Sequence, residues 1–207
     1  MMEVRRNAGI WMAAAFCASL GLAAGVVAHF GLERGVPVAL AATARLAFLI
    51  FWPAYAGGAL ASLFGNVFSP LREHARELGL AFAAALLVHL GLVACLCALG
   101  HPPRVRTFVI FGVAAGFTYC LAALSVPRLR EALPRNLWPP IRAVAMNYIA
   151  LAFFVDFARF PLNDLGAAVK YLPFAALATV GPMLRLAAWA QKQRHTFGRI
   201  DLRRQRL

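Results

Sequence analysis

The sequence predicts an all-α, polytopic membrane protein built as a bundle of six transmembrane helices. Of its 207 residues, 62% are apolar and 14% are charged, whereas soluble domains are nearer half apolar. Apolar runs long enough to cross about 30 Å of hydrocarbon recur along the whole chain, and Pro or Gly marks each turn between them. Because no soluble domain is left over, residues 1–207 are predicted to form a single transmembrane domain.

The first apolar run follows a basic start, which is also how a signal peptide begins. Its apolar part extends for about 22 residues from Ala8, longer than the roughly 7–15 residues of a cleaved signal. We therefore interpret it as a retained first helix. The six predicted spans are residues 8–30, 39–64, 79–100, 107–126, 143–160 and 171–190.

Orientation follows from the loops, because cytoplasmic loops carry an excess of Lys and Arg. Fifteen such residues lie on the side of the two termini and five on the other. Both termini, including the basic tail 191–207, are therefore predicted to be cytoplasmic, in the inner membrane of a bacterium. Basic residues beside spans also pair with anionic lipid headgroups, so the net charge of +13 requires no nucleic acid partner.

Ionisable side chains deep within the predicted spans are the most informative about function, because each costs several kcal/mol in hydrocarbon. His89 stands near the middle of the third span. One interpretation is a neutral imidazole hydrogen-bonded to another helix. The other is an axial heme ligand, in which one ring nitrogen binds iron and the other is held by a neighbouring acceptor.

Three further groups lie within or at the ends of the apolar runs. Arg45 is shallow enough in the second span for its stem to reach the outer interface, or it could pair with a heme propionate or with Asp156. Asp156 lies in the outer half of the fifth span, and His29 lies near the outer end of the first.

The third span also has a recognisable spacing. Arg76 is followed by Leu78-Gly79-Leu80, and His89 stands eleven positions after Leu78. This pattern resembles the third helix of the ferric reductase-like transmembrane domain family. The closest branch is the heme-binding membrane subunit of the bacterial protein-methionine-sulfoxide reductase system. Residues 44–55 and 137–157 are similar to the family's second and fifth helices, so the resemblance covers about residues 40–190.

The resemblance implies b-type heme bound through His89, but both later heme histidines of the family are replaced. One falls on Arg142 and the other at about Val155 or Asp156. Arginine is not a neutral donor to iron, and a carboxylate is an unusual axial ligand. Three possibilities stay open: His89 with His29 or Met146 as a second ligand, His89 alone, or a scaffold without heme.

Two functions follow. The first is a ferric reductase-like subunit that relays electrons across the membrane. Since the chain has no glycine-rich dinucleotide motif, hydride chemistry would need a separate protein partner, and the chain would be at most an electron-transfer subunit of an oxidoreductase. The alternative is a heme-free structural or assembly subunit of a larger membrane complex, for which the many small residues suit close helix packing. A small-solute transporter is disfavoured because the hydropathy pattern shows no internal repeat.

Overall fold

The computed structural model describes residues 2–134, 136–163 and 165–204, and side chains within 8–134, 136–158 and 169–194. The described chain contains six helices long and apolar enough to cross a membrane, so the predicted class is confirmed. The long helices are α1 (Met2–Phe30), α2 (Leu32–Phe64), α4 (Ala75–Ala98), α5 (Val105–Ala123), α7 (Trp138–Asn163) and α8 (Leu165–Arg204). The short ones are η1 (Gly65–Phe68), α3 (Ser69–Glu73) and α6 (Pro127–Glu131).

The turn between α1 and α2 is much shorter than the sequence predicts. Residues 31–38 are predicted as a loop, but α2 already begins at Leu32 and only Gly31 lies between the two helices. Gly31 has φ +77°, a left-handed conformation that glycine adopts without steric cost. Pro37 lies inside α2, where it removes one backbone hydrogen bond without ending the helix.

Helix α2 is the centre of the bundle, since it contacts α1, α4, α7 and α8. Helix α1 packs on α4 and α2 through a stripe of small buried residues, Ala15, Ser19 and Ala23. Residues four apart share one helix face, and small side chains let two backbones approach closely in a membrane. The abundance of alanine in the first span therefore serves helix packing.

Helices α1 and α2 approach each other closely at Gly35. A Cβ atom at this position would lie 2.7 Å from Val27 Cα and 3.3 Å from Val26 O. Gly35→Ala is therefore expected to force the two helices apart and lower the free energy of unfolding by about 1–3 kcal/mol. The measurement is the thermal unfolding midpoint in detergent, with Gly25→Ala as control because a Cβ there meets nothing within 4 Å. Equal midpoints for the two variants would contradict the close packing.

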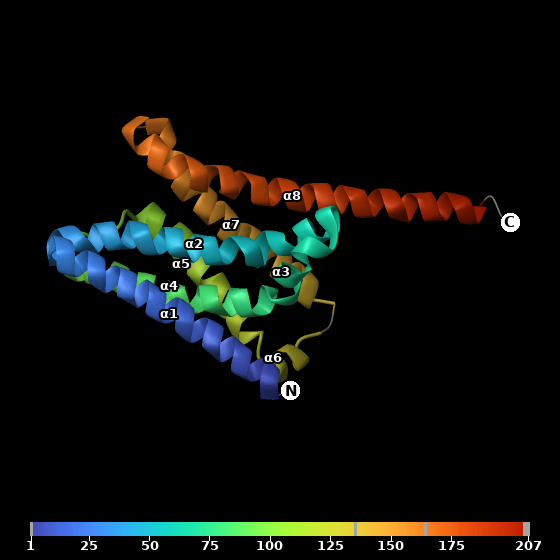
Figure 1. The fold of residues 1–207 in the computed structure, drawn as a ribbon, viewed down its shortest axis with the longest axis horizontal. Coiled ribbons are helices and arrows are strands. Elements are labelled where there is room, and N and C mark those ends of the chain that lie inside the picture. The colour runs from blue at the N-terminus through green and yellow to red at the C-terminus, as the bar shows by residue number, and fades with distance from the viewer. Residues whose placement is uncertain (1, 135, 164, 205–207) are drawn as a thin grey trace.

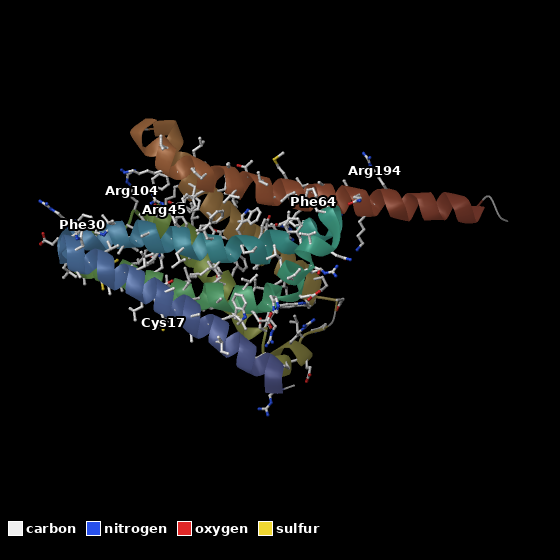
Figure 2. The ribbon with its side chains drawn as sticks, viewed as in Figure 1. Cys17, Phe30, Arg45, Phe64, Arg104 and Arg194 are labelled. Atoms are coloured by element: carbon white, nitrogen blue, oxygen red, sulfur yellow. The ribbon has the colours of Figure 1, made fainter. Side chains whose placement is uncertain are left out.

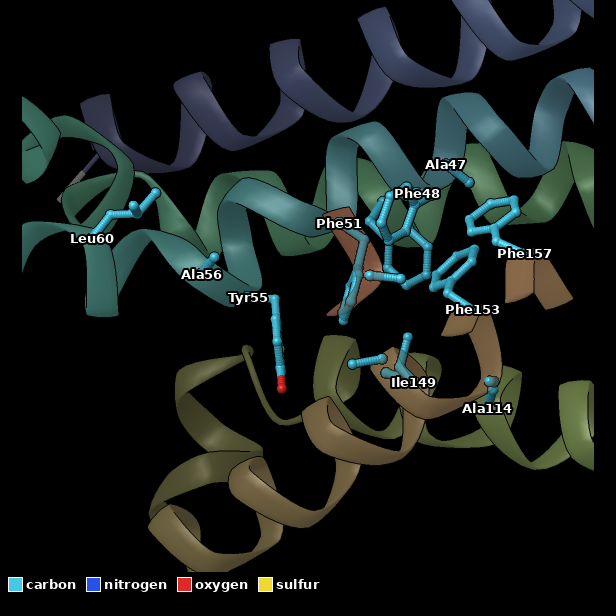
Figure 3. Close-up of a cluster of buried hydrophobic side chains, with 14 residues drawn as sticks. Ala47, Phe48, Phe51, Tyr55, Ala56, Leu60, Ala114, Ile149, Phe153 and Phe157 are labelled. Carbon is cyan, nitrogen blue, oxygen red and sulfur yellow. The ribbon is translucent and has the colours of Figure 1, made fainter. Parts of the chain in front are cut away.

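The main core is an aromatic cluster contributed by α2, α4 and α7 (Figure 3). The ring of Phe48 is 1% exposed and lies 5.1 Å from Phe153 and 5.0 Å from Phe157, centroid to centroid. Aromatic pairs at such distances contribute about 0.5–1.5 kcal/mol beyond area burial. This cluster fixes how α2 and α7 face each other.

The two ends of the bundle differ. The start of α1, the end of α8 and the short helices α3 and α6 lie toward one end, which we call the terminal end (Figure 1). The Gly31 turn lies at the opposite end, the turn end. Figure 2 shows Phe30, Arg45 and Arg104 toward the turn end and Arg194 toward the terminal end.

Candidate functional site

His89 lines a cavity of about 510 Å³ enclosed by α2, α4, α5 and α7, with Tyr171 of α8 at its edge. Most of the wall is apolar, including Phe82, Leu86 and Phe153. The volume lies within the range of about 300–1,000 Å³ that is usual for small-molecule and cofactor sites. The half-buried imidazole is the only histidine among the described residues of this wall.

One nitrogen of His89 is held by a neighbouring helix. Its Nδ1 lies 3.0 Å from Thr43 Oγ1 on α2. The Thr43 hydroxyl also lies 2.8 Å from the carbonyl oxygen of Ala39 and 3.2 Å from that of Leu40. The Ala39 contact is the shortest of the three, and the hydroxyl has a single hydrogen to donate. With that hydrogen on the Ala39 carbonyl, Nδ1–H of His89 donates to Thr43 Oγ1, and Nε2 keeps its lone pair.

The second nitrogen of His89, Nε2, is the one left for a ligand in the cavity that this residue lines. It forms no hydrogen bond with a described residue. It is also not sealed off, because the buried polar atoms without a partner among the described side chains are Ser19 Oγ, Arg45 Nε and Glu77 Oε2. The hydrogen bond to another helix that the sequence suggested is therefore present, and it leaves the nitrogen that could bind a ligand unused.

Asp156 on α7 lines the same cavity as His89. The resemblance places a heme histidine at about Val155 or Asp156, and of these two Val155 is 38% exposed and does not line the cavity. Thr118 on α5 faces the cavity too, but its hydroxyl donates to the carbonyl of Ala114 in its own helix, at 2.9 Å. The polar groups of the cavity wall thus come from three different helices.

Arg45 does not line this cavity, but its guanidinium lies over the ring of Tyr171, which does. Its guanidinium carbon is 4.5 Å from the ring centroid of Tyr171 and 5.7 Å from that of Phe174. A cation over a ring face is stabilised by the ring quadrupole. Arg45 makes no ion pair with Asp156 within the described part of the chain, and its buried Nε has no hydrogen-bond partner there. Of the alternatives that the sequence left open for Arg45, the pair with Asp156 is therefore not seen among the described residues.

The other predicted site residues lie elsewhere. His29 is exposed in the last turn of α1, edge-on to Phe30 with ring centroids 4.5 Å apart, and it does not line the cavity of His89. Met146 and Arg142 line two clefts that open between α2, α4, α7 and their neighbours. The structure thus brings together His89, Asp156 and the neighbourhood of Arg45, and does not bring His29, Met146 or Arg142 to them.

Thr43 is the residue that sequence reasoning missed. A threonine within an apolar helix gives no signal, because its hydroxyl can bond to the preceding turn of its own helix. Only the packing of α2 on α4 shows that Thr43 faces His89 across 46 positions of sequence. The spacing of four residues between Thr43 and Ala47, which lines the cavity, places Thr43 near that face but does not identify its partner.

The cavity can bind one flat or compact apolar molecule. That molecule would carry an electron-pair acceptor for the imidazole nitrogen of His89. Within the described residues, no group of three or more His, Cys, Asp or Glu side chains could hold a bare metal ion, so a ligand to Nε2 would have to bring most of its own coordination. Comparison of the chain with known protein families, characterised proteins and solved structures gives no match.

Proposed function

We propose that this protein is a ferric reductase-like subunit of a bacterial inner membrane that binds b-type heme through His89 and relays single electrons between separate donor and acceptor proteins. The observation that carries the proposal is the open Nε2 of His89 in an apolar cavity of about 510 Å³. When bound, heme would supply reversible one-electron transfer at its iron. The chain itself supplies ligation and a low-dielectric surrounding.

The residues present fit one axial ligand. A metal-binding imidazole usually donates its other N–H to a fixed acceptor, which sets the ring orientation and raises its basicity, and Thr43 Oγ1 occupies that place. A second histidine or a methionine is not present among the described residues of the wall. Of the three possibilities left open by the sequence, binding through His89 alone is the one we propose.

The buried Nε of Arg45 supports the proposal independently. An unpartnered donor of a charged group is costly in a low-dielectric interior, and a guanidinium binds carboxylates well. Arg45 would hold a propionate of the heme, while the rings of Tyr171 and Phe174 keep its guanidinium in place. Asp156 would face the same space, so its protonation state would influence the potential of the bound group.

An absorption spectrum tests the proposal directly. The full chain, purified in a mild detergent, is expected to show a Soret band and a change on reduction with dithionite, with about one heme per chain. With a single protein ligand, the reduced protein is expected to bind carbon monoxide without losing its imidazole ligand. Protein that has no Soret band and takes up no added hemin would refute the proposal and leave the structural or assembly subunit as the function.

Thr43→Val tests the role of the hydroxyl. Valine has nearly the shape of threonine, so the helix packing is retained while the acceptor for Nδ1–H is lost. Loss of such a partner is expected to reduce heme affinity about 10–100-fold, measured by titration of heme-depleted protein with hemin. Thr118→Val is the matched control, because Thr118 lines the cavity but bonds only to Ala114 of its own helix. Equal affinities for the two variants would exclude Thr43 as the positioning residue.

A further inference from the structure

Two adjoining clefts lie toward the terminal end of the bundle, and the smaller one shares Phe82, Thr118 and Ile149 with the wall of the cavity of His89. The larger, of about 570 Å³, lies between α2, α3, α7 and α8, and the smaller, of about 270 Å³, between α3, α4, α5, α6 and α7. Arg72, Trp138 and Arg142 line both. We call the two together the basic clefts, since their walls contain Arg72, Arg76, Arg130, Arg142, Arg185 and Lys192.

The charge of the basic clefts is one-sided. Against these six cations, Glu73 is the only carboxylate among the described lining residues. The cations come from α3, α4, α6, α7 and α8, so the fold, and not one basic segment, gathers them. Like charges held together in this way repel one another, and that repulsion is relieved when an anion binds between them.

Two of the cations lie over aromatic rings, which carry no negative charge to balance them. Arg185 lies 4.5 Å over the ring of Tyr55, and Arg130 lies 5.1 Å over the ring of Trp138. Arg72 and Arg142 form no hydrogen bond or ion pair with any side chain in the described ranges. These two arginines form the wall between the clefts, where a bound anion would meet cations from both sides.

The larger cleft is also apolar along its floor, where Gly58, Ala59, Met146 and Ala188 lie. These residues belong to helices that are candidate membrane spans, so the cleft continues from the basic rim into the membrane region. Trp138 and Trp189 line it as well, and tryptophan is enriched at membrane interfaces. A ligand that fills it would combine an anionic head with apolar chains.

We propose that the basic clefts bind a lipid whose headgroup carries two phosphates. Basic pockets between transmembrane helices are suited to anionic lipid headgroups, and arginine binds phosphate oxygens through two parallel hydrogen bonds. Two clefts that share Arg72 and Arg142 offer a place for each phosphate, and the five arginines of their walls exceed what one phosphate would balance. None of the arginines of the basic clefts lines the cavity of His89, so this proposal does not depend on the proposed heme site.

The test uses the full chain, delipidated in detergent and titrated with tetraoleoyl cardiolipin while the thermal unfolding midpoint is followed. Cardiolipin is expected to raise the midpoint at concentrations about tenfold lower than phosphatidylglycerol added at equal total charge. Each charged hydrogen bond lost should weaken binding roughly tenfold or more, so Arg72→Gln with Arg142→Gln is expected to abolish the difference. The matched control is the double variant Arg104→Gln with Arg106→Gln. Both arginines are exposed and neither lines the basic clefts.

A second variant tests occupancy without removing charge. A Cβ at Gly58 meets nothing within 4 Å, so Gly58→Leu is expected to fold, fill the larger cleft and weaken cardiolipin binding about tenfold. Gly91→Leu, at an equally open position on α4, should bind as the unmodified chain does. Equal effects of phosphatidylglycerol and cardiolipin would overturn the two-phosphate headgroup. If inorganic pyrophosphate raised the thermal midpoint as much as cardiolipin does, or if Gly58→Leu bound cardiolipin unchanged, the proposal that the ligand is a lipid would be wrong.

Discussion

Replacement of His89 by alanine is expected to abolish the Soret band of the purified protein. His89 is the only histidine among the described residues of the cavity wall, so the variant has no other imidazole to bind iron. Added imidazole is expected to restore the band, because the truncated side chain leaves room for it beside Thr43. Absorption spectra with and without imidazole measure both effects, and the thermal midpoint shows that the variant is folded.

His29→Ala separates the two histidines that the sequence offered as a pair. His29 is exposed at the end of α1 and lies outside the cavity, so this variant is expected to keep the full band. Loss of the band in His29→Ala would contradict ligation by His89 alone. Retention of the band in His89→Ala without imidazole would contradict the proposed site altogether.

Phe48→Ala is expected to cause a large loss of stability. Phe48 is 1% exposed, and its ring contacts Phe153, Phe157 and Phe174, so the change leaves a cavity at the junction of α2, α7 and α8. Truncations of this kind cost about 3–5 kcal/mol. The free energy of unfolding in detergent, titrated with a denaturing detergent, measures the loss.

Phe154→Ala is the matched control on α7. Its side chain is 38% exposed and would face lipid, where a truncated residue leaves no cavity within the protein. Its effect is expected to stay within about 0.5 kcal/mol. Comparable losses for Phe48→Ala and Phe154→Ala would mean that the aromatic cluster does not hold α2 against α7.

The spans could be predicted from sequence because a membrane helix is defined by length and apolar composition alone. The turns between the spans are less predictable from sequence. Gly, Glu and Pro in residues 31–38 read as a loop, yet one glycine with φ +77° completes the turn and Pro37 is absorbed within α2. A helix continues wherever packing compensates for one lost hydrogen bond, and that packing is not visible in a local pattern.

The candidate site was predictable only in part. His89 stands out because a titratable group deep in an apolar run is rare. Its partner Thr43 and the position of Arg45 over Tyr171 depend on how α2 crosses α4 and α8, which no spacing within one helix determines. The resemblance aligns Arg142 with a heme histidine, and Met146 is a possible substitute ligand, but both line the basic clefts. A position in a linear pattern does not fix the face of a helix that meets a given cavity.

The one-residue turn at Gly31 has a consequence for biosynthesis. Two helices joined by a longer loop can enter the bilayer one after the other and settle in separate orientations. With only Gly31 between α1 and α2, the connection is too short for the two helices to move apart. They are therefore expected to insert together as a hairpin, with Glu33 and Arg34 near its tip. The charges before α1 and after α2 then act jointly on orientation, so moving basic residues at one of these ends should reorient both helices or neither.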